Sequence, residues 1–311
     1  MSKIGSAKSL KVTVVMDNYV DVILRDEGPA KRWGIVASLT SPRQLLAEHG
    51  LSLLVEVEAE GVRRRVLMDC GFTEHGVPYN MEVLGIDPST IDLVFLSHGH
   101  RDHYAALHEV LRRAGRRLPV YVHPDAFYTR LFTFPNGLTA GPWRLDPASI
   151  EEAGGTVVAV RNTLQLAPGL ATTGEVERTT DFEKGLEVAR RVRDGVYEVD
   201  PIMDDQALVA YVEGLGLVVV TGCAHAGVVN TVKHSLRLAG VEEAYAVIGG
   251  FHLSGVEDWV VERTIEELRE LGVKVVVPMH CTGFKATARL AEAFKEGFVL
   301  SSVGTTFKLE A

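Results

Sequence analysis

Apolar residues occur along the first half of this chain in short runs of the length expected for β-strands. Strands are predicted over residues 11–16, 51–58, 64–68, 91–96 and 120–122, and the run at 51–58 partly alternates between apolar and polar positions. Leu107, Val110 and Leu111 recur at helical spacing, which predicts a helix over residues 104–114 that Gly115 ends. A shorter helix is predicted over residues 43–48, with His49 as its cap.

The second half repeats this order of strands followed by helices. Strands are predicted over residues 207–213, 217–220, 245–248, 274–277 and 305–309, and helices over residues 225–238, 257–271 and 283–294. Strand pairs that alternate with single helices in both halves favour two stacked sheets with helices on their outer faces. The predicted fold is therefore α/β, a four-layer α/β/β/α sandwich.

A single domain is predicted over residues 1–311, since α/β domains of this length are common. Residues 129–155 are predicted to be an inserted loop or lid, because they contain Pro135, Gly137, Gly141, Pro142 and Pro147.

Residues 214–232 carry no formally charged side chain over 19 positions, the length of a membrane span. Their four glycines favour instead a strand, a turn and the start of a helix, so no membrane segment is predicted.

Composition constrains the binding partners and the cellular compartment more than it constrains the chemistry of the protein. The net charge of −9 argues against a general nucleic-acid or anionic-membrane surface. Cys70, Cys223 and Cys281 form no C-x-x-C pair, which predicts a reducing, cytoplasmic compartment. Each of the three thiols is interpreted as a small apolar filler of the interior, with thiolate ligation of a metal by one of them as the alternative. The oligomeric state does not follow from the sequence.

The segment Ser97-His98-Gly99-His100-Arg101-Asp102-His103-Tyr104 carries the clearest chemical signal in the chain. It supplies three imidazoles and one carboxylate within six residues, directly after the buried strand predicted at 91–96. These groups are ligands for zinc, iron and manganese, and the end of a strand holds a loop firmly enough to direct them. A metal site is therefore predicted here.

Three further histidines follow the ends of predicted strands. His225 comes after the strand at 217–220, His252 after the strand at 245–248, and His280 after the strand at 274–277. Functional groups gather at the carboxyl ends of strands in α/β folds. We therefore expect these three side chains to lie close to the segment that contains His98 and His103.

At these residues the chain resembles the metallo-β-lactamase superfamily. The matching motifs are Met68-Asp69-Cys70-Gly71, the motif from His98 to His103, His225 and His280. The resemblance implies an α/β/β/α fold with a two-metal site at its edge. It implies that His98, His100 and His225 bind the first metal, and that Asp102, His103 and His280 bind the second. Asp69 would orient a ligand imidazole through its other ring nitrogen.

Further motifs are similar to one subgroup of that superfamily, named after dihydropterin-ribofuranosylaminobenzene 5′-phosphate synthase. They include Asp17-Asn18, Glu48-His49-Gly50-Leu51-Ser52, Asp204-Asp205-Gln206-Ala207-Leu208 and Thr221-Gly222-Cys223-Ala224-His225-Ala226-Gly227. The subgroup implies a metal-dependent transferase that joins a pterin-methyl diphosphate to an aromatic amine and displaces diphosphate. The alternative is a metallohydrolase that directs metal-bound hydroxide at a phosphoester, ester or lactone. A non-catalytic metal-dependent binding protein is disfavoured by the complete ligand set.

The chain departs from the superfamily at one position. A bridging aspartate usually lies between the third and last metal histidines, and Phe251-His252 stands there instead. Asp102 and His252 are the predicted catalytic residues, and His252 is a metal ligand, a substrate contact or an acid.

The remaining predictions concern the substrate and the metal. Asp17, Asn18 and Lys285 are the predicted substrate-binding residues, Lys285 because the first turn of a helix and a cation together receive phosphate. A solvated lysine is the alternative interpretation of Lys285. The expected partner is a small molecule, phosphorylated or pterin-like, and the expected cofactor is one or two zinc ions, with iron, manganese or magnesium as alternatives.

Overall fold

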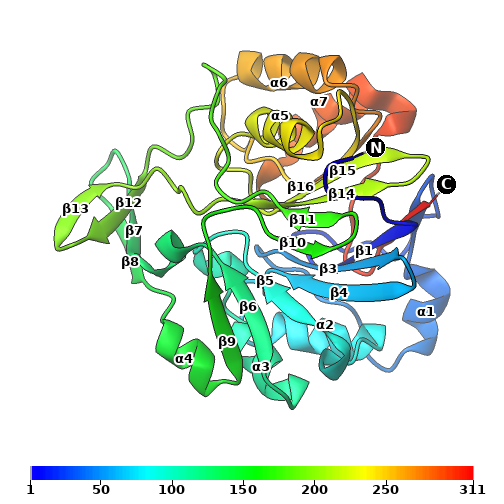
Figure 1. Ribbon diagram of the computed structural model, residues 1–311, viewed down its shortest axis with the longest axis horizontal. Helices are drawn as coiled ribbons and strands as arrows, with labels where there is room; N and C mark the ends of the chain where they lie inside the picture. Colours follow the sequence, from blue (N-terminus) through cyan, green and yellow to red (C-terminus); the bar gives the residue numbers. More distant parts are fainter. Residues whose placement is uncertain (1, 311) are drawn as a thin grey trace.

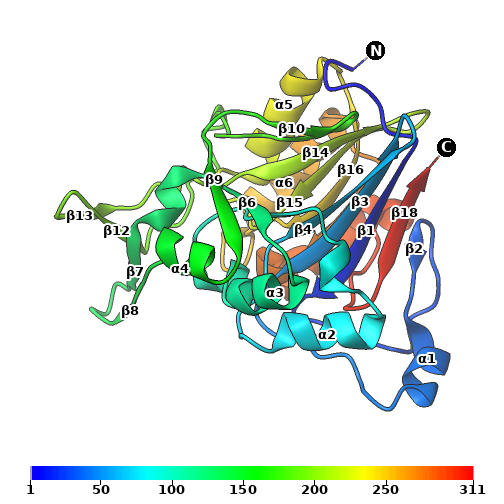
Figure 2. The ribbon, with the colours of Figure 1, turned by 60° about the horizontal axis from the view of Figure 1, so that its bottom comes forward.

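A computed structural model describes residues 2–310, whose strands form three sheets (Figures 1 and 2). The first sheet has the order β2 (Ala30–Lys31), β18 (Thr306–Glu310), β1 (Ser9–Met16), β3 (Ser52–Ala59), β4 (Val62–Met68), β5 (Leu93–Phe95), β6 (Leu118–Val122) and β9 (Gly155–Ala159). The second has the order β10 (Gln165–Ala167), β11 (Leu170–Thr172), β14 (Ala207–Val212), β15 (Gly216–Thr221), β16 (Ala244–Gly250) and β17 (Val275–Met279).

Helices cover the outer faces of these two sheets, as Figure 1 shows. Three of them pack on the first sheet: α2 (Gly76–Leu84), α3 (Leu107–Ala114) and α4 (Pro147–Glu152). Three others pack on the second sheet: α5 (Val228–Ala239), α6 (Asp258–Glu270) and α7 (Phe284–Phe294). A further helix, α1 (Gly34–Thr40), follows β2. The chain therefore has the predicted four-layer α/β/β/α arrangement.

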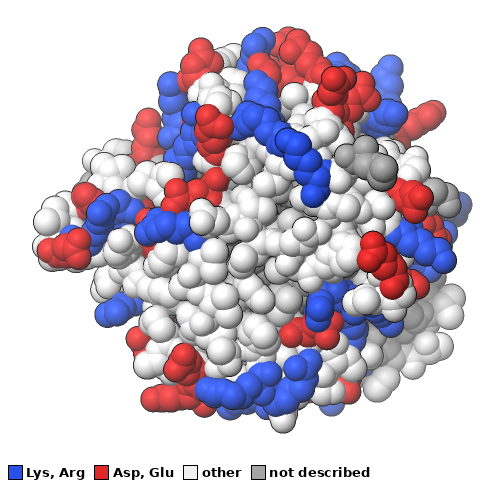
Figure 3. All heavy atoms as spheres, viewed as in Figure 1, with Lys and Arg blue, Asp and Glu red and all other residues white. Residues whose placement is uncertain are grey.

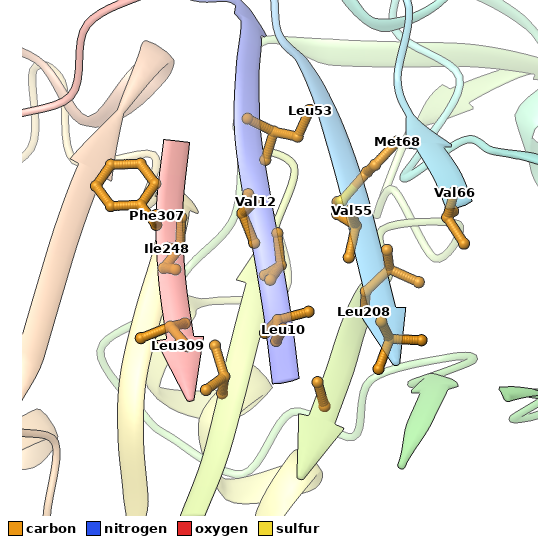
Figure 4. Close-up of a cluster of buried hydrophobic side chains, with 14 of the residues drawn as sticks. Leu10, Val12, Leu53, Val55, Val66, Met68, Leu208, Ile248, Phe307 and Leu309 are labelled. Atoms are coloured by element: carbon orange, nitrogen blue, oxygen red, sulfur yellow. The ribbon is translucent and has the colours of Figure 1, made fainter. Parts of the chain in front are cut away.

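The two sheets face each other across an apolar core, shown in Figure 4. Leu10, Val12, Leu53 and Val55 of the first sheet face Ile248 and other side chains of the second. Each such side chain contributes about 1.5–3 kcal/mol when it is removed from water. Leu54 points to the opposite face of β3 and packs in the core beneath α2 and α3. Because β3 is buried on both faces, its sequence alternates only in part.

The third sheet changes the prediction for residues 129–155. They do not form an irregular loop: β7 (Thr129–Thr133) and β8 (Thr139–Trp143) are an antiparallel pair, and α4 follows them. This pair continues into a four-stranded sheet through β12 (Ala189–Arg193) and β13 (Val196–Val199), which projects from one side in Figure 1. The local pattern of Pro and Gly does not predict strands here. Strands from later in the chain supply the backbone hydrogen bonds that stabilise them.

The short helix predicted over residues 43–48 is wrong. Residues 41–51 contain no helix in the structure. The side chain of Asn80, in α2, accepts a hydrogen bond from the Leu46 backbone N–H (2.9 Å) and donates one to the Leu46 carbonyl (2.8 Å). Leu46 thus finds its backbone partners in another element, and the helical hydrogen bonds are not needed.

Acidic and basic side chains alternate around the rim of the face shown in Figure 3. None of the helices within residues 2–310 combines the length and the apolar run that a bilayer crossing requires.

Candidate metal centre

Strand ends from both sheets meet at one edge of the sandwich. β4 and β5 are parallel neighbours in the first sheet, and β15, β16 and β17 are parallel neighbours in the second. The segments that follow these strands carry Asp69, the His98–His103 motif, His225, His252 and His280. The rings of His98 and His225, which follow strands of different sheets, lie 4.8 Å apart between centroids. The structure therefore brings together the histidines that the sequence places after separate strands.

His98, His100 and His225 form a buried cluster. One nitrogen from each lies within 4.8 Å of the others, and the three residues are 0%, 5% and 3% exposed. The Nδ1 atom of His98 contacts the Ser97 hydroxyl (2.9 Å), so its Nε2 atom faces His100 Nδ1 at 3.0 Å. Adjacent nitrogen ligands of a tetrahedral zinc lie about 3.3 Å apart, given Zn–N bonds of about 2.05 Å. The separation of His98 Nε2 and His100 Nδ1 is close to this value, and the His225 nitrogen lies near enough to complete a three-ligand group.

Asp102, His103 and His280 form a second cluster beside the first. The Asp102 Oδ2 atom lies 3.2 Å from His280 Nε2 and 3.7 Å from His103 Nε2. Burial favours the neutral acid, yet His103 and His280 together hold the pKa of Asp102 well below its usual range. The carboxylate is therefore charged and faces two imidazoles, as a second metal site requires.

Asp69 binds the segment 97–104, here called the metal loop because it carries the predicted ligands. It follows β4 with a left-handed backbone (φ 62°) and is fully buried. One carboxylate oxygen accepts hydrogen bonds from the Ser97 hydroxyl (2.7 Å) and His103 Nδ1 (2.7 Å), and the other accepts one from the Ser97 N–H (2.8 Å). Burial lowers the pKa of His103, but Asp69 and Asp102 outweigh it and raise the pKa to about 9. With Nδ1 held by Asp69, the Nε2 atom of His103 faces the second cluster.

We expect Asp69→Asn to weaken metal binding at the second cluster by about 10- to 100-fold, because the amide cannot hold both Ser97 and His103 as a carboxylate does. Titration of the metal-free variant with zinc measures this change. Asp194→Asn, at a residue with an 89% exposed side chain, is the control and should bind metal as the unaltered protein does. Equal affinities in the two variants would contradict the role given to Asp69.

The donor set fits a divalent metal on evidence from the structure itself. Both ring nitrogens of His225, Nε2 of His100 and Nδ1 of His252 are buried and have no hydrogen-bond partner. Burial and the neighbouring imidazoles lower the pKa values of His98 and His225 well below the usual value, and that of His100 falls to about 3. Buried polar atoms without partners are costly, and neutral imidazole is the form that binds a metal.

Acid should destabilise the metal-free protein. The pKa values of His98, His100 and His225 are lowered on folding, so below pH 6.5 the unfolded chain binds protons that the folded chain does not. Stability should therefore fall as the pH drops below 6.5, by up to about 1.4 kcal/mol per pH unit for each imidazole. The contribution of His100 should extend down to about pH 3. Urea unfolding of chelator-treated protein at several pH values tests this prediction, and a flat profile between pH 6.5 and 5 would count against it.

A buried ion pair holds the metal loop to the third sheet. Arg130, in β7, is 1% exposed and donates to Asp204 Oδ2 (2.8 Å) and Asp200 Oδ2 (2.7 Å). Asp204 Oδ2 also accepts a hydrogen bond from the Gly99 N–H (2.7 Å), between two metal histidines. A Cβ atom at Gly99 would collide with Ala126 and Arg130, so this close approach requires glycine. Sequence reasoning did not find this ion pair, since Arg130 stood in the presumed lid.

Two of the three predicted substrate-binding residues lie beside His280, and the third lies on the surface. Asp17 is buried, and its Oδ1 atom accepts a hydrogen bond from the His280 N–H (2.9 Å). Asn18 contacts His280 Nδ1 through its amide oxygen (3.2 Å) and donates to the His280 carbonyl (3.0 Å). Both residues line a cavity of about 390 Å³ beside His280. Lys285 instead pairs with Asp258 of α6 and has a 72% exposed side chain, in line with a solvated lysine.

Two residues near the clusters were interpreted too simply. His49 was expected to cap a helix, yet its Nε2 atom lies 4.0 Å from Asp102 Oδ2 and its Nδ1 atom 3.1 Å from the Asn18 amide nitrogen. Cys223 was expected to be an apolar filler, yet its Sγ atom lies 3.2 Å from His103 Nε2. A position near the clusters could have been predicted for both residues, because they lie inside the motifs Glu48-His49-Gly50 and Gly222-Cys223-Ala224-His225.

His252 lies at the same edge as the clustered histidines. It follows β16 with a left-handed backbone (φ 47°), and its ring centroid is 4.2 Å from that of His225. One of its nitrogens is within 4.8 Å of His225 and Cys223 donor atoms.

Comparison with known proteins identifies the family. Residues 64–195 match the β-lactamase superfamily domain. A 7,8-dihydropterin-6-methyl-4-(β-D-ribofuranosyl)-aminobenzene-5′-phosphate synthase of Methanocaldococcus jannaschii is 37% identical over 312 residues, with 99% of both chains covered. The chain belongs to this synthase family of the metallo-β-lactamase superfamily. It is therefore an enzyme of a superfamily that uses divalent metal ions.

Two further proteins are similar to this chain along most of its length. An uncharacterised protein of the same archaeon is 28% identical over 276 residues, which cover 87% of this chain and 97% of that one. The crystal structure of a metal-dependent hydrolase of the β-lactamase superfamily has a TM-score of 0.75 and 25% identity, covering 97% of this chain and 99% of that one.

Proposed function

We propose that this protein is a metal-dependent transferase that joins a pterin-methyl diphosphate to an aromatic amine and releases diphosphate. The observation that carries this proposal is the 37% identity to the archaeal synthase along the whole of both chains. In the reaction, the amine nitrogen bonds to the methyl carbon while the carbon–oxygen bond to diphosphate breaks. The electron pair of that bond leaves with diphosphate, and the amine gives up a proton.

The two clusters are the proposed binding sites for metal. His98, His100 and His225 would hold one ion, and Asp102, His103 and His280 would hold another. Zinc is the first expectation, because imidazole and carboxylate in this number suit it, and iron, manganese or magnesium are the alternatives. A divalent ion supplies Lewis-acid stabilisation of the charge that develops on the departing diphosphate.

The cavity beside His280 is the proposed place for an aromatic part of the substrate. Its polar end is formed by Asp17, Asn18 and His280, and its apolar walls include Tyr19, Phe284 and Phe298. Phe284 is 90% exposed and Tyr19 is 42% exposed, which leaves their rings free to stack on another ring. An apolar pocket with few polar groups is the usual form of a small-molecule site.

His252 is the proposed acid that protonates the leaving group, and His252→Ala tests this role. We expect metal content to stay constant and the rate to fall by about 10²-fold or more, the usual contribution of a general acid. If His252 is instead a metal ligand, the same variant should lose metal and bind the rest about tenfold more weakly. His108→Ala, in a half-buried residue of α3 that contacts Ser149, is the control. Unchanged metal and unchanged rate would assign His252 a structural role.

A metallohydrolase is the second candidate. It is favoured by the 25% identity, along nearly the whole chain, to a protein described as a metal-dependent hydrolase. The discriminating experiment incubates the metal-loaded enzyme with a pterin-methyl diphosphate, with and without an aromatic amine, and with a panel of phosphoesters, esters and lactones. Diphosphate release that requires the amine supports the transferase. Amine-independent hydrolysis of a panel member, with no coupled product, would replace it.

A reducing, cytoplasmic setting is part of this proposal. Cys70, Cys223 and Cys281 are buried and free, as the absence of paired spacing led us to expect. The proposed partner is a small phosphorylated or pterin-like molecule.

A further inference from the structure

The thiol of Cys223 occupies a position between the two proposed metal sites. Its donor atom lies within 4.8 Å of those of His98 and His103 in one group, of His225 and His252 in a second, and of His280 and Cys281 in a third. The first proposed site contributes His98 and His225 to these groups, and the second contributes His103 and His280. Cys223 thus neighbours ligands of both sites.

The surroundings of Cys223 are polar, and their spacing is compatible with that of a metal ligand. Its Sγ atom lies 3.2 Å from His103 Nε2. Adjacent sulfur and nitrogen ligands of a tetrahedral zinc lie about 3.6 Å apart, given Zn–S and Zn–N bonds of about 2.3 and 2.05 Å. Both ring nitrogens of His225, which is 3% exposed, are buried and have no hydrogen-bond partner. One of these nitrogens lies within 4.8 Å of the Cys223 sulfur.

Charge provides a second, independent reason. The proposed ligands include one carboxylate, Asp102, for two divalent cations in a buried site. Two such cations repel each other strongly where water does not screen them. The resemblance to the superfamily predicts His252 where a shared carboxylate would otherwise lie, so an anionic side chain between the metals would reduce their repulsion. Thiolate is an anion that zinc and similar metals bind well.

We propose that Cys223 is a metal ligand shared by the two sites, with its thiolate bridging the two ions. This proposal rests on the two-metal site put forward above. On metal binding, the Cys223 S–H bond breaks, the proton is released to solvent, and the sulfur electron pairs bind the metals. Cys281 is not the bridge, because its thiol is directed at the Cys223 carbonyl (3.6 Å) and it shares a group with His280 alone among the proposed metal ligands.

Cobalt(II) provides a direct test, because a thiolate ligand produces a near-ultraviolet sulfur-to-cobalt charge-transfer absorption that imidazole and carboxylate do not. Metal-free protein is titrated with cobalt, and bound cobalt is counted by metal analysis. We expect this absorption to grow through both the first and the second equivalent. Cys223→Ala should abolish it and weaken cobalt binding by about tenfold or more at both sites. Cys70→Ala and Cys281→Ala are the matched controls and should keep it.

The possible failures are distinguishable. If the unaltered protein binds cobalt without this absorption, the thiolate proposal is overturned while the metal site stands. If the absorption grows during one equivalent only, or disappears in Cys281→Ala but not in Cys223→Ala, the bridging role of Cys223 is overturned. If the unaltered protein binds no cobalt or zinc, the proposed function falls together with this inference. Because the titration of the unaltered protein is informative alone, a variant that does not fold leaves the proposal testable.

Discussion

Replacing His98 and His225 together with alanine should remove the metal of the first site and reduce kcat/KM by about 10³-fold or more. The two residues supply two of the three imidazoles in the buried cluster with His100. One remaining imidazole cannot hold an ion in competition with water. A catalytic metal contributes several kcal/mol of transition-state stabilisation, and each 1.4 kcal/mol is a factor of ten in rate.

Metal analysis of the dialysed variant, together with the rate of diphosphate release, checks this expectation. His75→Ala changes an exposed histidine just before α2 and serves as the control, with metal and rate unchanged. Circular dichroism establishes that the double variant is folded. A folded double variant that retains its full metal content would refute the assignment of the first site.

Arg130→Met is expected to cost about 3–5 kcal/mol of folding stability. Removing one partner of a buried ion pair leaves the other charge without compensation. Here two carboxylates, Asp200 and Asp204, would both be left in the interior. Arg130 also holds the pKa of Asp204 at about 2 against the effect of burial, so the carboxylate stays charged throughout the neutral range.

The consequence should extend to the metal loop, because Asp204 also binds the Gly99 N–H between His98 and His100. Urea unfolding gives the change in free energy, and zinc titration gives the change in metal affinity. Arg193→Met, which alters a 52% exposed side chain of β12 paired with exposed Asp194, should change stability by less than about 0.5 kcal/mol. A loss below about 1 kcal/mol for Arg130→Met would show that the buried pair is not a structural support.

The sequence determined the types of the central elements and the chemistry of their ends. Apolar runs such as residues 91–96 and 217–220 become β5 and β15, because burial of both faces of a central strand requires continuous apolar residues. Histidines directly after such runs are held at the strand end by covalent geometry. The pattern from His98 to His103, and the later His225 and His280, could therefore be predicted as one site before any contact was known.

Tertiary structure decided everything that depends on which segments meet. Cys223 and His103 are 120 residues apart in the chain, and they touch because the two sheets stack with their strand ends at one edge. The helix predicted near His49 gave way to an extended segment, since Asn80 offers Leu46 its backbone partners. Within residues 129–155, β7 and β8 form strands that join a larger sheet, because β12 pairs with β7. Local patterns record the preferences of a segment alone, whereas partners distant in sequence supply the hydrogen bonds and charges that settle its final form.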